Sequence, residues 1–143
     1  MAAAARAKQG RWLASFYVLL VPLAAAGDGF QTPAIAPSEL QALQGVTDGP
    51  VVLDLRDPGE YRAGHVPGAL NIPEPELERR LGELDPGRSL VLYCIAGKRT
   101  RSAERTLLAH GFADIRHLDG GLTGWLDASY AVGKGAAPQP PGR

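Results

Sequence analysis

The 143-residue sequence contains a single cysteine, Cys94, so no disulfide can form within the chain. Its formal net charge is zero, and it has no basic stripe of the kind that binds nucleic acid. The three histidines, His65, His110 and His117, do not have the spacing of metal ligands. We therefore expect neither a nucleic-acid partner nor a metal ion, and the sequence indicates no other cofactor.

Long hydrophobic runs are also scarce, and the most prominent one lies near the N-terminus. The uncharged stretch 12–26 follows three cationic residues and ends in three alanines, a layout typical of a secretory signal. It is shorter than a membrane-spanning helix and is interrupted by Pro22. We therefore expect a cleavable signal peptide at 1–26 and a periplasmic or secreted protein, with no stable membrane insertion after cleavage. The alternative is an uncleaved segment that anchors the chain to a membrane.

The rest of the chain is predicted to form one small α/β domain. Segments rich in glycine, proline and alanine indicate a linker at 27–37 and a disordered tail at 133–143, which leaves a domain at 38–132. Apolar runs predict strands, and residues at helical spacing predict helices between them. Such alternation favours a small parallel sheet with helices on both faces. The expected strands are 51–56, 70–73, 89–94 and 115–118, and the expected helices are 38–45, 75–84, a helix from near Thr100 to Gly111, and one after 120.

Cys94 lies where such a fold places its ligands, at the carboxyl end of a predicted strand and just before a helix. Gly97 permits a backbone conformation that other residues resist, so the amides of a short loop can converge on one centre. Thr100 is expected to cap the following helix with its hydroxyl, and that helix adds the positive end of its dipole. These groups favour a thiolate and an anion beside it. The alternative is a buried, inert core thiol.

The side chains after Cys94 fit a small anionic substrate. Lys98, Arg99 and Arg101 supply positive charge, and we expect Lys98 and Arg99 to matter most. Ile95 and Ala96 are apolar, so they add no polar recognition.

Three stretches of the sequence, in order, resemble the signatures of single-domain rhodaneses. They are LDLRDPGEYRAGHVPGALNIP at 53–73, YCIAGKRTRSA at 93–103 and LDGGLTGW at 118–125. Together with the export signal, they make the chain most similar to the small periplasmic rhodaneses of the phage-shock-protein-E type. The resemblance implies the rhodanese-like α/β fold and a sulfurtransferase of the thiosulfate:cyanide type.

The resemblance also implies a two-step covalent mechanism and a set of site residues. Cys94 would take a sulfane sulfur from thiosulfate or a similar small anion, become a persulfide, and pass the sulfur to cyanide, a thiol or a protein acceptor. Rhodanese-fold phosphatases and arsenate reductases have an active-site loop that resembles the pattern Cys-x5-Arg. This chain lacks that pattern, because the sixth residue after Cys94 is Thr100 and not arginine. A sulfur carrier without turnover and a non-catalytic interaction domain remain as alternatives. The residues expected to bind substrate are Ile95, Ala96, Gly97, Lys98, Arg99 and Thr100.

Asp54 and Arg56 at the end of the first predicted strand are candidate supporting residues. An Asp-x-Arg pair there can act in catalysis, but the structural alternative is favoured, with the carboxylate accepting loop N–H groups and the arginine joining loops near the site. Glu60 is expected to pair with a cation such as Arg62. Trp125 is expected to anchor the last helix in the core, and the alternative places it at the mouth of the pocket.

Overall fold

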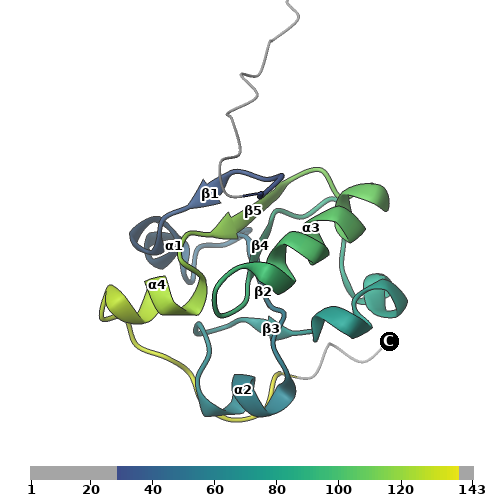
Figure 1. Ribbon diagram of the computed structural model, residues 1–143. Coiled ribbons are helices and arrows are strands. Elements are labelled where there is room, and N and C mark those ends of the chain that lie inside the picture. Colours follow the sequence, from purple (N-terminus) through teal and green to yellow (C-terminus); the bar gives the residue numbers. More distant parts are fainter. Residues whose placement is uncertain (1–28, 139–143) are drawn as a thin grey trace, which may run out of the picture.

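A computed structural model describes residues 29–138 of the chain, and the expected signal peptide lies outside that range. Its centre is a five-stranded sheet in the order β1-β5-β4-β2-β3, in which all neighbouring strands are parallel (Figure 1). The predicted α/β fold with a parallel sheet is confirmed. The strands are β1 (Ala34–Ile35), β2 (Val51–Asp54), β3 (Leu70–Asn71), β4 (Leu90–Tyr93) and β5 (Ile115–Leu118).

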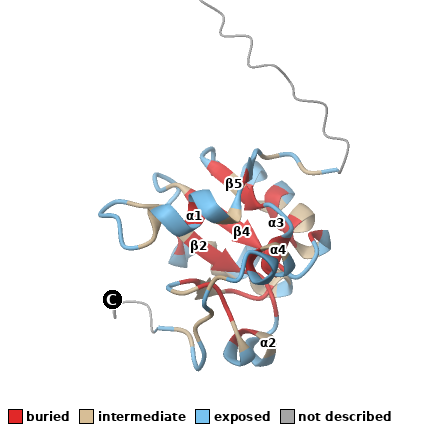
Figure 2. Ribbon diagram, turned by 90° about the vertical axis from the view of Figure 1, so that its left-hand side faces the viewer, coloured by how far each residue is buried: buried red, intermediate tan, exposed pale blue. Residues whose placement is uncertain are grey.

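Helices cover both faces of this sheet. Each face of the sheet carries a hydrophobic core, because side chains alternate between the two faces along each strand. In β4, Leu92 belongs to the first core and Val91 to the second core. α3 (Lys98–Ala109) and two short 3-10 helices, η1 (Glu74–Glu76) and η2 (Glu78–Glu83), cover the first face. The second is covered by α1 (Pro37–Leu43), α2 (Pro58–Ala63) and α4 (Gly121–Asp127). The most buried segments are accordingly the central strands (Figure 2).

The structure differs from several of the expected elements. The expectation of one continuous α-helix at 75–84 is wrong: the segment forms two short 3-10 helices, in which an N–H donates to the carbonyl three residues earlier. α3 begins at Lys98 with Gly97 as its N-cap, so the helix starts two residues before Thr100. The strands expected at 51–56, 70–73 and 89–94 are shorter, and the last of these leaves Cys94 just beyond the end of β4.

The folded unit also extends beyond both ends of the segment 38–132. Within the expected linker, Ala34–Ile35 forms edge strand β1 beside β5. Within the expected tail, Gly133 forms a bridge with His65, and Ala137 packs against the second core. Residues 139–143 lie outside the described range. In residues 29–138, none of the helices is long and apolar enough to span a membrane.

Candidate active site

Cys94 occupies the carboxyl edge of the parallel sheet, between β4 and α3. Its side chain is buried, with 1% of the residue exposed, and it belongs to the core on the α3 side of the sheet. The following two residues, Ile95 and Ala96, are exposed, whereas Gly97 is buried again. The loop therefore carries the backbone from the core to the surface and back within three residues, with the sulfur underneath it.

Gly97 turns its backbone N–H toward the sulfur. Its φ of +107° lies in the left-handed region, and its N–H donates to Cys94 Sγ over 3.0 Å. The conformational role predicted for Gly97 is thus confirmed. A side chain at this position would be strained by φ and would also collide with Phe30, whose Cζ would lie 2.7 Å from the new Cβ.

Thr100 has a different position from the one predicted. It lies inside the first turn of α3, so its hydroxyl does not cap the helix. The side chain is buried, and among the described residues its hydroxyl has no hydrogen-bond partner of ordinary geometry. That leaves the hydroxyl proton available to an anion at the neighbouring sulfur.

The loop lowers the pKa of the Cys94 thiol. Burial alone raises this pKa, because it penalises the thiolate. The Thr100 hydroxyl and the backbone N–H groups of Thr100, Gly97 and Ala96 outweigh burial, since each stabilises the negative sulfur. The site therefore favours a thiolate without a histidine base, as the sequence predicts.

α4 supports the loop from behind. Leu122 N–H donates to the Cys94 carbonyl over 2.9 Å, and the Thr123 hydroxyl donates to the Ile95 carbonyl over 3.2 Å. Gly121 allows this approach, because a Cβ there would lie 2.6 Å from the Cys94 carbonyl oxygen. These residues were not assigned to the site from the sequence, although the Gly-Gly pair at 120–121 was the signal that could have revealed them.

The two predicted cations differ in their surroundings. Lys98 is exposed, whereas Arg99 is half-buried and pairs with Glu60 of α2 over 2.9 Å. The expected pairing of Glu60 with a cation is therefore confirmed, but the cation is Arg99 and not Arg62. Glu60 also accepts a hydrogen bond from the Asp57 N–H in the capping box of α2. The Glu60 hydrogen bond raises the pKa of Arg99, and Cys94 contributes in the same direction. Arg99 thus places a fixed positive charge near the sulfur.

Asp54 and Arg56 form a buried pair at the end of β2. The Asp54 carboxylate accepts hydrogen bonds from the Arg56 backbone and guanidinium, and from the Tyr93 hydroxyl over 2.6 Å. Arg56 also donates to the Gly64 carbonyl over 2.7 Å. These contacts join β2, β4 and the loop after α2, as the structural alternative expects. A supporting role for the pair in the site remains a prediction.

His65, His117 and Trp125 belong to the scaffold, whereas His110 is exposed. His65 stacks on Tyr61 and His117 stacks on Phe30, while Trp125 is fully buried and donates to the Ala131 carbonyl. The predicted core position of Trp125 is confirmed. Within residues 29–138, no three side chains of the metal-binding types form a group that could hold an ion.

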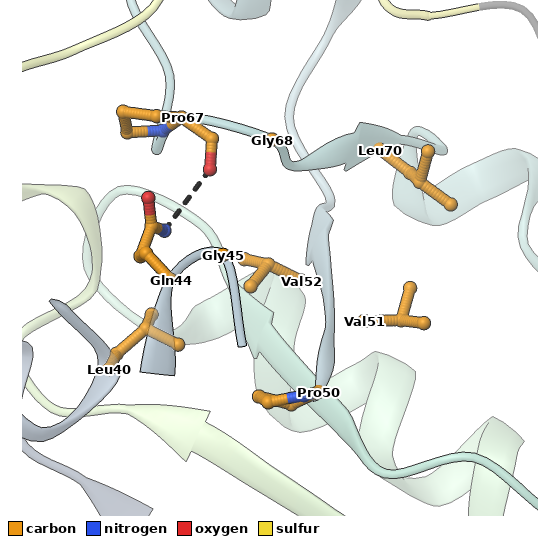
Figure 3. Close-up of a pocket in the computed structure, with 9 residues that line it drawn as sticks. All are labelled: Leu40, Gln44, Gly45, Pro50, Val51, Val52, Pro67, Gly68 and Leu70. Carbon is orange, nitrogen blue, oxygen red and sulfur yellow. Dashed lines mark hydrogen bonds between the residues drawn. The ribbon is translucent and has the colours of Figure 1, made fainter. Parts of the chain in front are cut away.

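A hollow of about 420 Å³ lies away from Cys94. Figure 3 shows its nine lining residues, which come from the end of α1, the start of β2 and the approach to β3. They are largely apolar, and the amide of Gln44 is already bonded to the Pro67 carbonyl over 3.1 Å. None of them belongs to the loop 94–100, so the candidate active site is defined by the loop itself.

Comparison with known proteins identifies this architecture. The model of the rhodanese-like domain family matches residues 36–128, and the chain belongs to that family. It is 31% identical, with a TM-score of 0.66, to the crystal structure of a thiosulfate sulfurtransferase from Pseudomonas aeruginosa, covering 74% of this chain and 21% of that one.

Three curated relatives show the range of proteins that contain this domain. Thiosulfate sulfurtransferase GlpE from Shewanella oneidensis is 35% identical over 54% of this chain and 77% of its own length. A putative sulfur carrier protein, YrkF from Bacillus subtilis, is 34% identical over 52% of this chain and 40% of its own length. An HTH-type transcriptional regulator from Mycobacterium tuberculosis is 36% identical over 78% of this chain, and the match spans only half of that relative.

Proposed function

We propose that the protein is a sulfurtransferase that moves sulfane sulfur from thiosulfate, or a similar small anion, through a persulfide on Cys94. The observation that carries this proposal is the environment of the Cys94 sulfur. The Gly97 N–H donates to it over 3.0 Å, and neighbouring amides and the Thr100 hydroxyl stabilise its anion. The similarity to proteins named thiosulfate sulfurtransferase supports the same reaction.

The proposed reaction has two displacements at sulfur. The Cys94 thiolate attacks the outer sulfur of thiosulfate, the S–S bond breaks, and sulfite leaves with the bonding electron pair. Cyanide or a thiolate then attacks the outer sulfur of the persulfide, and Cys94 leaves as a thiolate. Thiocyanate or a new persulfide is the product, and no proton has to be moved by a separate base.

The loop residues have distinct parts in this proposal. The amides and the Thr100 hydroxyl that stabilise the thiolate would also stabilise the persulfide anion. Arg99 and Lys98 would attract the negatively charged donor, with Arg99 held in place by Glu60. Ile95 and Ala96 would line the entrance without offering polar groups.

A carrier role is the second candidate, because one relative is named a putative sulfur carrier protein. A carrier forms the same persulfide on Cys94 but passes the sulfur on only to a partner protein. Steady turnover with thiosulfate and cyanide separates the two functions. A chain that accepts one sulfur but does not turn over would be a carrier.

Intact mass spectrometry tests the shared first step. After exposure to thiosulfate and desalting, we expect the mass to increase by one sulfur atom, and cyanide should reverse the increase. Cys94→Ser should show no gain. A serine variant that still gains sulfur, or a folded wild-type chain that gains none, would contradict the proposal.

We also propose that the protein acts outside the cytoplasm, in the periplasm or as a secreted protein. The cationic start, uncharged stretch and alanine site at 1–26 support this. Cell fractionation combined with the N-terminal mass of the purified protein tests it. A full-length chain in the membrane fraction would favour the anchored alternative, and a cytoplasmic full-length chain would contradict both.

A further inference from the structure

The segment 29–32, expected to be linker, packs against the active-site loop. The Phe30 ring stacks on His117 with 3.7 Å between ring centres and 9° between planes. It also lies so close to Gly97 that a Cβ on that glycine would be 2.7 Å from Phe30 Cζ. The guanidinium carbon of Arg101 lies 5.2 Å from the centre of the same ring. Phe30 thus fills the space between β5 and the turn that leads into α3.

Buried polar contacts fix this segment to the middle of α3. Glu104 is fully buried and accepts hydrogen bonds from the Gln31 N–H, over 2.8 Å, and from the Thr32 hydroxyl. Thr32 also lies 3.2 Å from His117 Nδ1. Because a buried carboxylate that loses its donors is costly, the two residues that follow Phe30 are held firmly against α3.

Gly97 needs an external support of this kind. Glycine adopts left- and right-handed conformations about equally readily, so nothing intrinsic to Gly97 keeps φ at +107°. Yet its N–H reaches Cys94 Sγ only in a defined orientation, at 3.0 Å. The Phe30 ring lies directly against Gly97, in the volume that a Cβ on this residue would occupy, so the turn is packed on that side.

We propose that Phe30 is a positioning residue for the active site: its ring holds Gly97 in the conformation that directs the Gly97 N–H onto the Cys94 sulfur. Because Glu104 holds the segment 29–32 against α3, this segment also contributes to the reactivity of Cys94. This inference rests on the proposed function only in treating the Cys94 thiolate as the working group.

The test measures the reactivity of Cys94 toward iodoacetamide as a function of pH in the full chain. Phe30→Ala should slow alkylation near neutral pH by roughly 3- to 10-fold, as expected for a weakened hydrogen bond to a charged group, and should move the midpoint to higher pH. Phe30→Leu, which keeps apolar bulk against Gly97, should recover most of the rate. Leu43→Ala is the matched control, because it removes packing from α1 on the second core.

A second experiment tests the contact between Phe30 and Gly97 with a double-mutant comparison. Gly97→Ala should reduce alkylation less in the Phe30→Ala chain than in wild type, because the collision with the ring is gone while the strain of φ remains. If Phe30→Leu and Phe30→Ala both keep the wild-type profile, or if Leu43→Ala changes it equally, the proposal is overturned. Persulfide formation by wild type is tested separately by mass, so failure of the proposed function and failure of this inference give different results.

Discussion

Arg99 of the active-site loop and Glu60 of α2 form an ion pair, with Nη1 and Oε2 2.9 Å apart. The pair connects two of the three signature stretches of the sequence. It is partly exposed, with 29% of the arginine and 41% of the glutamate side chain accessible, so its contribution to folding stability is small. We therefore expect the pair to act mainly by fixing the direction of the Arg99 guanidinium near the buried sulfur.

The first prediction separates that positioning role from stability. Glu60→Gln should change the melting temperature little but lower kcat/KM for thiosulfate several-fold, because Arg99 loses the partner that orients it. Arg99→Ala should lower kcat/KM for thiosulfate at least as much, and it should affect alkylation by neutral iodoacetamide less. Steady-state kinetics and a thermal melt provide both readouts.

Arg80→Ala is the control for this experiment. Arg80 forms ion pairs of the same kind with Glu76 and Glu83, on the 3-10 segment. We expect its removal to leave thiosulfate kinetics unchanged. Equal losses in Arg80→Ala and Arg99→Ala would show that only general surface charge matters.

The second prediction concerns the Thr100 hydroxyl. Thr100→Val keeps the shape of the buried side chain but removes the group that contributes first among those lowering the pKa of Cys94. The midpoint of Cys94 alkylation should therefore move to higher pH, and the rate at neutral pH should fall by roughly 3- to 10-fold. Thr106→Val, farther along α3, should leave the profile unchanged, since its hydroxyl donates to the Ser102 carbonyl. An unchanged midpoint in Thr100→Val would remove the hydroxyl from the mechanism.

The third prediction concerns the close contact between α4 and the loop. A Cβ at Gly121 would lie 2.6 Å from the Cys94 carbonyl oxygen and 2.7 Å from that of Ile95, at a φ of +59°. Gly121→Ala should therefore destabilise the fold by roughly 2–4 kcal/mol in a urea titration, because backbone must move. Gly59→Ala in α2 is the matched control: its Cβ meets nothing within 4 Å, so we expect a change of less than about 1 kcal/mol, in the stabilising direction. Equal stability of the two variants would mean that α4 does not pack tightly on the loop.

The sequence was sufficient for the parts of the site that depend on local chemistry. Cys94 after a strand and Gly97 in the following turn can be recognised from residue type and order alone. The start of α3 was misplaced because a glycine N-cap leaves no side-chain signal. The Arg99–Glu60 pair and the Phe30–Gly97 contact join residues far apart in the chain, and neither has a local pattern. The edge strand at 34–35 was missed because two residues carry no detectable periodicity.

The last prediction concerns acid stability and Glu104, which is fully buried on α3. Burial raises the pKa of Glu104, but hydrogen bonds from His117, the Gln31 N–H and the Thr32 hydroxyl outweigh it, so the folded-state pKa is lowered. A carboxyl whose pKa is lowered by folding stabilises the protein above its unfolded pKa, about 4.3 for glutamate, and this stability is lost as pH falls through the folded-state value. The free energy of unfolding should therefore decline as the solution is acidified below about pH 5.

Glu104→Gln should be less stable than the wild type at neutral pH by about 1–3 kcal/mol. Its stability should also decline less steeply in acid, because the glutamine side chain cannot take up the proton that Glu104 takes up. Glu78→Gln, at an exposed position, should follow the wild-type curve. Parallel acid curves for Glu104→Gln and wild type would show that the Glu104 carboxylate does not hold the segment 29–32 on α3.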